Sequence, residues 1–192
     1  MILEQKQSLR SEARRVLTTL DSVRRLEESR KIVAHLVQWD SWINAQTVCA
    51  FVALDSEPDV LTPWPAGKRI ILPRVAGSLL ELRFVEAACD LIQGSFGILE
   101  PSLEAPPAPA EADLILVPGL AFDPCGVRLG RGRGFYDRLL SSFSGTRVGV
   151  CFEESVLSQL PAEPHDERMD YLLTPAGVIS CGFQNRHPNS DA

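Results

Sequence analysis

Short apolar runs recur along this 192-residue chain and alternate with segments of helical periodicity. Continuous apolar runs of this length are typical of strands that are buried on both faces, as in a parallel sheet covered by helices. The runs lie at 47–54, 69–72, 114–117, 147–150 and 171–174. The alternation predicts an α/β fold: a single-domain, three-layer α/β/α sandwich with a mainly parallel, Rossmann-like sheet.

The remaining elements follow from spacing and from residues that begin or end them. Predicted helices cover 3–20, the segment from Asp21 or Ser22 to near Trp39, 135–143, and 155–160 before Pro161. We expect Pro73 to end the strand at 69–72, and two further strands at 80–85 and 178–179. The Pro/Ala-rich segment 104–112 is short enough to be a surface crossover. We therefore expect one domain over 1–184 and a flexible tail over 185–192.

Composition narrows the function classes. The net charge is −6, which argues against a general nucleic-acid binder. No segment approaches the ~20 apolar residues of a membrane helix, and charges near the N-terminus argue against a signal peptide. The five cysteines are odd in number and none is spaced for a metal pair. These features predict a reduced, cytoplasmic protein in which most cysteines are small buried residues, with Cys125 placed in a loop.

The segment 116–138 has the most unusual composition. Glycine occupies every second position from Gly130 to Gly134, and four arginines surround it: Arg128, Arg131, Arg133 and Arg138. Glycines let a backbone approach a ligand closely, and arginines supply forked, permanently charged donors. A helix start after the loop favours an anion. A phosphate site is the leading interpretation, and the carboxylate of Asp137 suggests a metal beside it.

The loop matches neither standard nucleotide fingerprint. It lacks the Gly-Lys-Ser/Thr ending of a P-loop and the spacing of a dinucleotide-binding loop. A tight strand-to-helix connection with solvated arginines stays open as an alternative. A disordered Arg-Gly tail that binds nucleic acid is disfavoured, because the loop lies between two strongly hydrophobic elements.

The longer string is more specific. Pro-Gly-Leu-Ala-Phe-Asp, Gly-Val-Arg-Leu-Gly and Gly-Arg-Gly-Phe-Tyr-Asp-Arg, all within 118–138, closely resemble the signature of 5-formyltetrahydrofolate cyclo-ligases, also called methenyltetrahydrofolate synthetases. Further segments resemble the same family in the same order: 6–10, 51–54 with Glu57, 94–101, Leu160-Pro161, His165-Asp166, Asp170 and Thr174. Phe135 stands where the family often has tyrosine.

The resemblance implies an enzyme that uses ATP and Mg²⁺ to convert 5-formyltetrahydrofolate to 5,10-methenyltetrahydrofolate, ADP and phosphate. Phosphorylation of the formyl oxygen would create a leaving group, and N10 of the folate would then close the ring. Positioning and charge neutralisation are the main requirements of phosphoryl transfer. The substrate would be a small molecule, free or polyglutamylated, and we expect a monomer with no membrane or nucleic-acid partner.

The resemblance also implies roles for individual residues. Arg128 would stabilise charge on the transferring phosphate and is the candidate catalytic residue. The residues implied to hold ATP are Lys6, Gln7, Ser8, Leu9, Arg10, Arg128, Leu129, Gly130, Arg131, Gly132, Arg133, Gly134, Phe135 and Tyr136. The residues implied to contact the folate are Val52, Glu57, Arg131, Gly132, Arg133, Gly134 and Phe135.

Asp137 and Asp170 would hold Mg²⁺, directly or through water, because one or two carboxylates plus phosphate oxygens are its usual ligands. We expect His165 to be structural and Asp123 to brace the glycine loop. Two alternatives remain: a non-catalytic folate- or nucleotide-binding regulator on the same scaffold, and a related ATP-using ligase with another N-acyl substrate. The presence of Lys6, Arg128, Asp137 and Asp170 favours the enzyme.

Overall fold

The computed structural model describes residues 1–94 and 97–182, so the predicted tail at 185–192 lies outside the described residues. Its helices are α1 (Ile2–Thr18), α2 (Ser22–Gln38), α3 (Asp40–Asn44) and α4 (Phe135–Leu140). Its strands are β1 (Thr47–Cys49), β2 (Arg69–Ala76), β3 (Leu79–Val85), β4 (Leu91–Gln93), β5 (Leu99–Pro101), β6 (Leu114–Pro118), β7 (Ala121–Phe122), β8 (Arg128–Leu129), β9 (Thr146–Val150), β10 (Tyr171–Thr174) and β11 (Gly177–Ser180).

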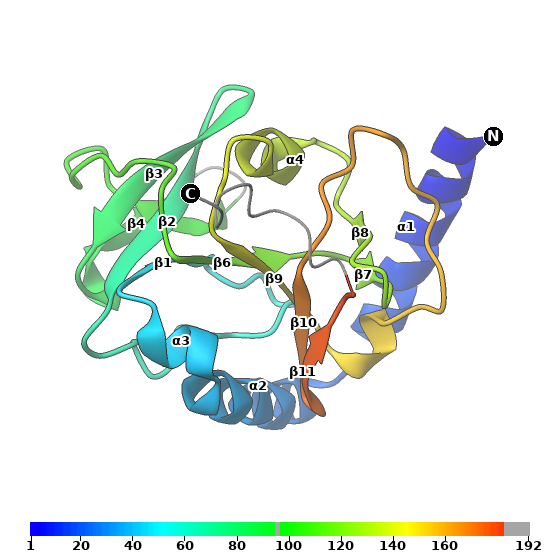
Figure 1. Ribbon diagram of the computed structural model, residues 1–192, viewed down its shortest axis with the longest axis horizontal. Coiled ribbons are helices and arrows are strands. Elements are labelled where there is room, and N and C mark those ends of the chain that lie inside the picture. Colours follow the sequence, from blue (N-terminus) through cyan, green and yellow to red (C-terminus); the bar gives the residue numbers. More distant parts are fainter. Residues whose placement is uncertain (95–96, 183–192) are drawn as a thin grey trace, which may run out of the picture.

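A seven-stranded sheet forms the centre of the molecule, in the order β11-β10-β9-β6-β1-β2-β3 (Figure 1). The five inner strands are parallel, and β3 and β11 pair antiparallel at the two edges. Numbered along the chain, the parallel strands lie in the order 2-1-3-4-5, one of the common doubly wound orders. The predicted fold class is confirmed.

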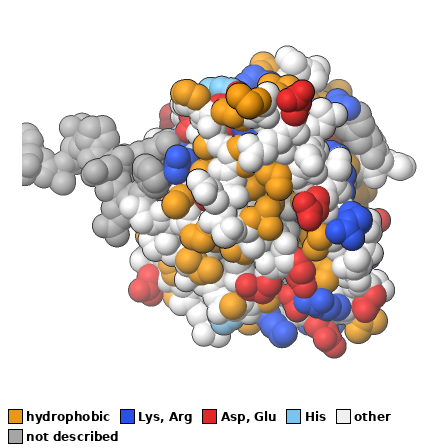
Figure 2. All heavy atoms as spheres, turned by 90° about the vertical axis from the view of Figure 1, so that its right-hand side faces the viewer, with side chains coloured by type: hydrophobic (Ala, Val, Ile, Leu, Met, Phe, Trp, Pro, Cys, Tyr) orange, Lys and Arg blue, Asp and Glu red, His pale blue; other side chains and the backbone are white. Residues whose placement is uncertain are grey.

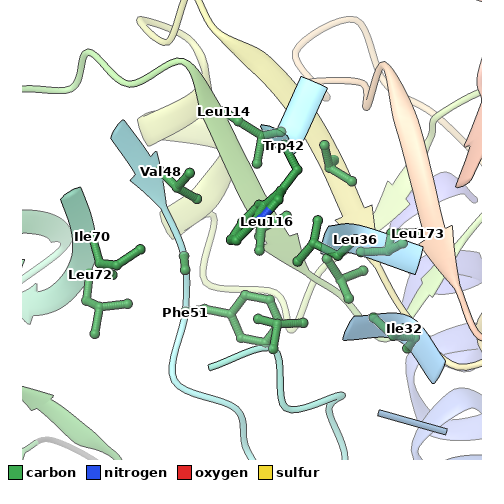
Figure 3. Close-up of a cluster of buried hydrophobic side chains, with 14 of the residues drawn as sticks. Ile32, Leu36, Trp42, Val48, Phe51, Ile70, Leu72, Leu114, Leu116 and Leu173 are labelled. Carbon is green, nitrogen blue, oxygen red and sulfur yellow. The ribbon is translucent and has the colours of Figure 1, made fainter. Parts of the chain in front are cut away.

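Helices cover both faces of the sheet. On one face α2 and α3 pack against the sheet, and on the other face lies the short α4 (Figure 1). Apolar side chains from α2, α3 and the strands fill the first interface (Figure 3). They include Ile32, Leu36, Trp42, Val48, Phe51, Ile70, Leu72, Leu114, Leu116 and Leu173. The second interface buries Leu139, Leu140 and Phe143 against the opposite face.

The first two helices form as their sequence predicts. Asp21 caps α2, since its Oδ1 accepts a hydrogen bond of 2.8 Å from the backbone N–H of Arg24. The face of the molecule that includes α1 mixes acidic and basic side chains with apolar ones (Figure 2).

Three local predictions are wrong in extent. The strand at 47–54 stops at Cys49, and β2 continues through Pro73 to Ala76. Pro73 fits because β1 pairs with β2 only as far as Ile71, so the missing N–H costs no bond to β1. The helix predicted at 135–143 ends at Leu140.

Long-range backbone pairing shapes two further segments: the helix predicted at 155–160 does not form, whereas the surface crossover predicted at 104–112 is confirmed. Instead of a helix at 155–160, a 3₁₀ turn spans Glu153–Ser155, and the N–H of Leu157 then donates to the carbonyl of Phe122 at 2.8 Å. The crossover 104–112 lies along the outer edge of β3, where its backbone exchanges hydrogen bonds with Leu82 and Phe84. Edge pairing of this kind shields an otherwise open strand.

Candidate active site

A cavity of about 440 Å³ opens where β1 and β6 end side by side. The chain leaves β1 toward β2 on one side and later returns as β6 on the other, so this is the topological switch point of the sheet. In open α/β sheets, ligands bind in the crevice outside the carboxyl ends of strands at such a point. Phe51 and Val52 after β1, and Pro118 and Gly119 at the end of β6, line the cavity.

The predicted loop forms one wall of this cavity. Every residue from Arg128 to Asp137 lines it, beginning on β8 and ending in the first turn of α4. Gly132 and Gly134 have φ values of +98° and +67°, a region in which other residues are strained. Gly134 is also the residue before α4. The glycines therefore shape a turn that keeps the backbone against the cavity.

Arg128 is buried behind this turn, with 7% of its surface exposed. Its Nη2 donates to Oδ1 of Asp137 at 2.7 Å, and its Nη1 to the carbonyl of Pro118 at 3.4 Å. A Cβ on Gly130 would lie 2.8 Å from Nη1 of Arg128, so a larger residue there would displace the guanidinium. The structure thus joins the predicted catalytic arginine to one of the predicted metal ligands.

Lys6 reaches the cavity from α1 and is 6% exposed. Its Nζ donates to Oδ2 of Asp166 at 2.6 Å and to Oε2 of Glu163 at 2.8 Å. Burial alone would lower the pKa of Lys6, but the hydrogen bonds and charges of Asp166 and Glu163 raise it above its ordinary value. The ammonium group is therefore charged at neutral pH and held by two carboxylates.

Two more predicted residues meet across the cavity. Nε and Nη2 of Arg131 donate to Oε1 of Glu57 at 3.1 and 2.8 Å. Glu57 is buried, and its Oε2 accepts the N–H of Leu54 at 3.1 Å. Nε of Arg10 donates to the carbonyl of Gly130 at 3.0 Å, which ties α1 to the loop.

The other side of the cavity is apolar. Residues from β2, β3 and β5 line it together with the aromatic pair that begins α4: Pro73, Val75, Leu80, Leu99, Phe135 and Tyr136. Burial, with contributions from Cys49 and Glu57, raises the pKa of Tyr136 well above its ordinary value, so its phenol stays neutral. One site thus combines a cationic wall with an apolar, partly aromatic one.

Some predicted residues lie elsewhere. Gln7, Ser8 and Leu9 are not among the described residues that line the cavity. Asp170 precedes β10 at the amino-terminal edge of the sheet, and its Oδ2 accepts the backbone N–H of Arg147 at 2.8 Å. The cavity lies at the opposite, carboxyl-terminal edge, so the structure does not bring Asp170 and Asp137 together.

Asp123 holds the turn between β7 and β8, which precedes the glycine loop, rather than the glycine loop itself. It is 2% exposed, and its carboxylate accepts N–H groups of Cys125, Val127 and Leu160 at 2.9–3.0 Å. His165 lies beside Asp166 at the cavity, with 73% of its side chain exposed.

The cysteines play no evident part in the cavity. Cys49, Cys151 and Cys181 are buried, whereas Cys89 and Cys125 are exposed. Burial raises the pKa of Cys49 to about 12, so a reactive thiolate does not form there near neutral pH. None of the five is among the described residues that line the cavity.

The sequence did not single out three cavity carboxylates. Glu163 and Asp166 compensate Lys6, and Glu100 lies in the wall formed by β5. The segments that hold Glu100 and Asp166 carry the family resemblance, so a signal was present, although it assigned them no role. Their long separation from Lys6 and from the loop hides the contacts from any local pattern.

Comparison with known proteins bears on the identity of this site. The family model described as the 5-formyltetrahydrofolate cyclo-ligase family matches residues 2–175. A 5-formyltetrahydrofolate cyclo-ligase of Mycolicibacterium smegmatis is 41% identical over 152 residues, covering 72% of this chain and 78% of the relative. The enzyme of that name from Escherichia coli strain K12 is 30% identical, with 79% and 90% covered.

Solved structures agree. The NMR structure of Aquifex aeolicus 5,10-methenyltetrahydrofolate synthetase superposes with a TM-score of 0.85 at 32% identity, covering 96% of both chains. A synthetase from Mycoplasma pneumoniae shares the fold, with a TM-score of 0.68 at 19% identity. None of the helices within the described ranges is long and apolar enough to span a membrane.

The match runs from the start of α1 to β10 and so includes every wall of the cavity. The resemblance carried by the glycine–arginine loop and the motifs around it is confirmed. The chain belongs to the 5-formyltetrahydrofolate cyclo-ligase family of enzymes.

Proposed function

We propose that this protein converts 5-formyltetrahydrofolate and ATP to 5,10-methenyltetrahydrofolate, ADP and phosphate, with Mg²⁺ as the metal. One observation carries the proposal: a single cavity joins a glycine–arginine loop, with the buried cations Lys6 and Arg128 beside it, to an apolar, aromatic wall. A triphosphate fits the first part and a flat pterin the second. The relatives named 5-formyltetrahydrofolate cyclo-ligase support the assignment.

The cationic wall receives ATP. Backbone N–H groups of Gly130, Gly132 and Gly134 approach the phosphates, while Lys6 and Arg10 bind them from α1. Arg128 is held beside the loop and stabilises charge on the phosphoryl group as it leaves ADP. Each of these cations has a protein partner, a carboxylate or a carbonyl, so ATP would replace partners that already hold the cations in place.

The carboxylate of Asp137 is suited to hold Mg²⁺. Its side chain is 30% exposed on the cavity, and Oδ1 alone is used by Arg128. One carboxylate together with phosphate oxygens and water is an ordinary magnesium site. The metal, when bound, neutralises phosphate charge. Because Asp170 is bonded at the other edge of the sheet, we assign this site to Asp137 as its one protein ligand.

The apolar wall receives the folate. Val52 and Phe135 contact the pterin, Glu57 accepts its N–H groups, and Arg131 holds Glu57 in position. Phe135 keeps an aromatic face at a position where the family often has tyrosine. This face and Tyr136 exclude water from the reacting atoms.

The reaction then proceeds in two steps. The formyl oxygen attacks the γ-phosphorus of ATP and ADP leaves, which makes the formyl carbon electrophilic. N10 attacks that carbon and loses its proton, and phosphate leaves with the formyl oxygen. The chain orients the reactants and stabilises the developing charge, and these two effects account for most of the catalysis of phosphoryl transfer.

Absorbance of methenyltetrahydrofolate tests the proposal. Purified protein with ATP, Mg²⁺ and 5-formyltetrahydrofolate should generate that absorbance, and folded protein that gives no ATP-dependent signal would refute it. Binding of both ligands without turnover would support the regulator instead.

Asp137→Ala should weaken Mg²⁺ binding, so that the Mg²⁺ concentration at half-maximal rate rises about tenfold or more. Asp40→Ala, an exposed carboxylate at the start of α3, is the matched control and should leave it unchanged. The cytoplasmic location and the monomeric state stay predictions from the sequence.

A further inference from the structure

Five carboxylates line the cavity, and four of them are paired with a cation. The pairs are Asp137 with Arg128, Glu57 with Arg131, and both Glu163 and Asp166 with Lys6. The fifth carboxylate is Glu100. Among the described residues, no cation lies within ion-pair distance of it.

Glu100 is also one of the most deeply buried acidic residues, with 3% of its surface exposed. Its Oε2 has no hydrogen-bond donor among residues 1–94 and 97–182. The carboxylate lies against the Cα of Gly94, where any Cβ would collide with it. A buried carboxylate without a partner destabilises a protein, because it loses its hydration and gains no partner, so packing alone does not explain this residue.

Glu100 meets two environments, since its Oε2 is sealed against Gly94 while the residue also forms part of the cavity wall. Glu100 lies on β5, which is fixed to β2 by a 2.9 Å hydrogen bond from Nη1 of Arg74 to the carbonyl of Pro101. Its neighbours in the cavity wall come from β2, β3 and β5 and are apolar: Pro73, Val75, Leu80, Ile98 and Leu99. A single acceptor in an apolar wall is typical of a group that orients a ligand through one donor.

We propose that Glu100 recognises the folate by accepting a hydrogen bond from one of its N–H groups. This inference rests on the proposed function, since a reduced pterin with its N10 amine offers several such donors. Glu57 already accepts two N–H groups of Arg131 and one of Leu54, whereas Oε2 of Glu100 accepts none among the described residues. Glu100 is thus the one cavity carboxylate without a protein donor among the described residues, and it adds a second acceptor for the folate to the one that Glu57 offers.

This role predicts that removing the carboxylate weakens folate binding without lowering the stability of the protein. A hydrogen bond to a charged acceptor is lost in Glu100→Gln and Glu100→Met, so the Kd for 5-formyltetrahydrofolate, measured by calorimetry without ATP, should rise about 10- to 100-fold. The Tm of the ligand-free variants should stay unchanged or rise, because a costly buried charge is removed. The Kd for MgATP should not change. Glu104→Gln, an exposed glutamate nearby, is the matched control.

Other outcomes would overturn the assignment. If both variants lower the Tm and bind the folate as tightly as the wild type, Glu100 is structural. If neither the Tm nor the Kd for the folate changes, the carboxylate does not contact the substrate. If the wild-type protein itself binds no 5-formyltetrahydrofolate, the proposed function fails together with this assignment, and the wild-type titration separates that case from the other two.

Discussion

Lys6→Met removes the ammonium group that joins α1 to Glu163 and Asp166. The lysine side chain is 7% exposed, and those of Glu163 and Asp166 are 25% and 12% exposed. Breaking a fully buried pair costs about 3–5 kcal/mol, and the partial exposure of the carboxylates reduces this to about 2–3 kcal/mol. For a chain of this size, that loss lowers the Tm by about 5–10 °C.

The same variant makes a prediction about pH. Burial alone would raise the pKa of Asp166, but hydrogen bonds from Lys6 and from the backbone of Glu163 hold it below its ordinary value. In the wild type this contribution is complete above the ordinary carboxyl pKa of about 4 and is lost as pH falls through the lowered pKa. The Lys6→Met protein lacks most of this contribution to stability, so the Tm difference between the two proteins should narrow below about pH 4.

Calorimetric unfolding of both proteins across the acid range checks this reasoning. Lys31→Met, which replaces an exposed lysine of α2, should unfold within about 1 °C of the wild type. A Lys6→Met protein as stable as the wild type at neutral pH would show that the ion pairs do not stabilise the fold. A Tm difference that persists at pH 3 would show that the carboxylates are not the cause.

Two further substitutions test the loop and its supporting hairpin. Arg128→Lys loses the forked contacts with Asp137 and Pro118, and steady-state kinetics should show kcat reduced about 100-fold; a decrease under threefold would remove Arg128 from the reaction. Gly126→Ala has φ of +78° and a Cβ that would collide with the carbonyl of Met169, so denaturant unfolding should show a loss of about 3 kcal/mol. Gly67→Ala, at φ +75° in open space, should cost about 1 kcal/mol, and equal losses would disprove the collision.

The sequence predicted the sheet because its signal is local. Each buried strand is an apolar run of its own, and the order of runs and helices follows from the chain. The end of β1 is different: Ala50 still donates to Ile71, but the apolar residues after it leave the sheet to line the cavity. An apolar side chain looks the same in a sequence whether it packs on a helix or lines a binding site, so the strand was predicted too long.

Partners far apart in the chain explain the other differences. The segment after Ser155 has the spacing of a helix, but its backbone bonds Phe122, which lies more than thirty positions earlier. Asp170 shows the same effect in the site. Family resemblance placed it with Asp137, whereas the structure uses its carboxylate to join the first residues of β9 and β10. Spacing along the sequence carries no information about such long-range contacts.

The charge pattern of the cavity gives a physical reason for a metal. The described lining contains five lysine or arginine residues and five carboxylates, so its formal charges cancel. A triphosphate carries several negative charges, and a neutral site gives it little net attraction. Under the proposed function, ATP would displace carboxylates from Lys6 and Arg128, and these carboxylates would be left partly buried without a counter-charge. A divalent cation held by Asp137 would supply the missing positive charge, so that Arg128 could pair with phosphate while the carboxylate of Asp137 kept a counter-charge.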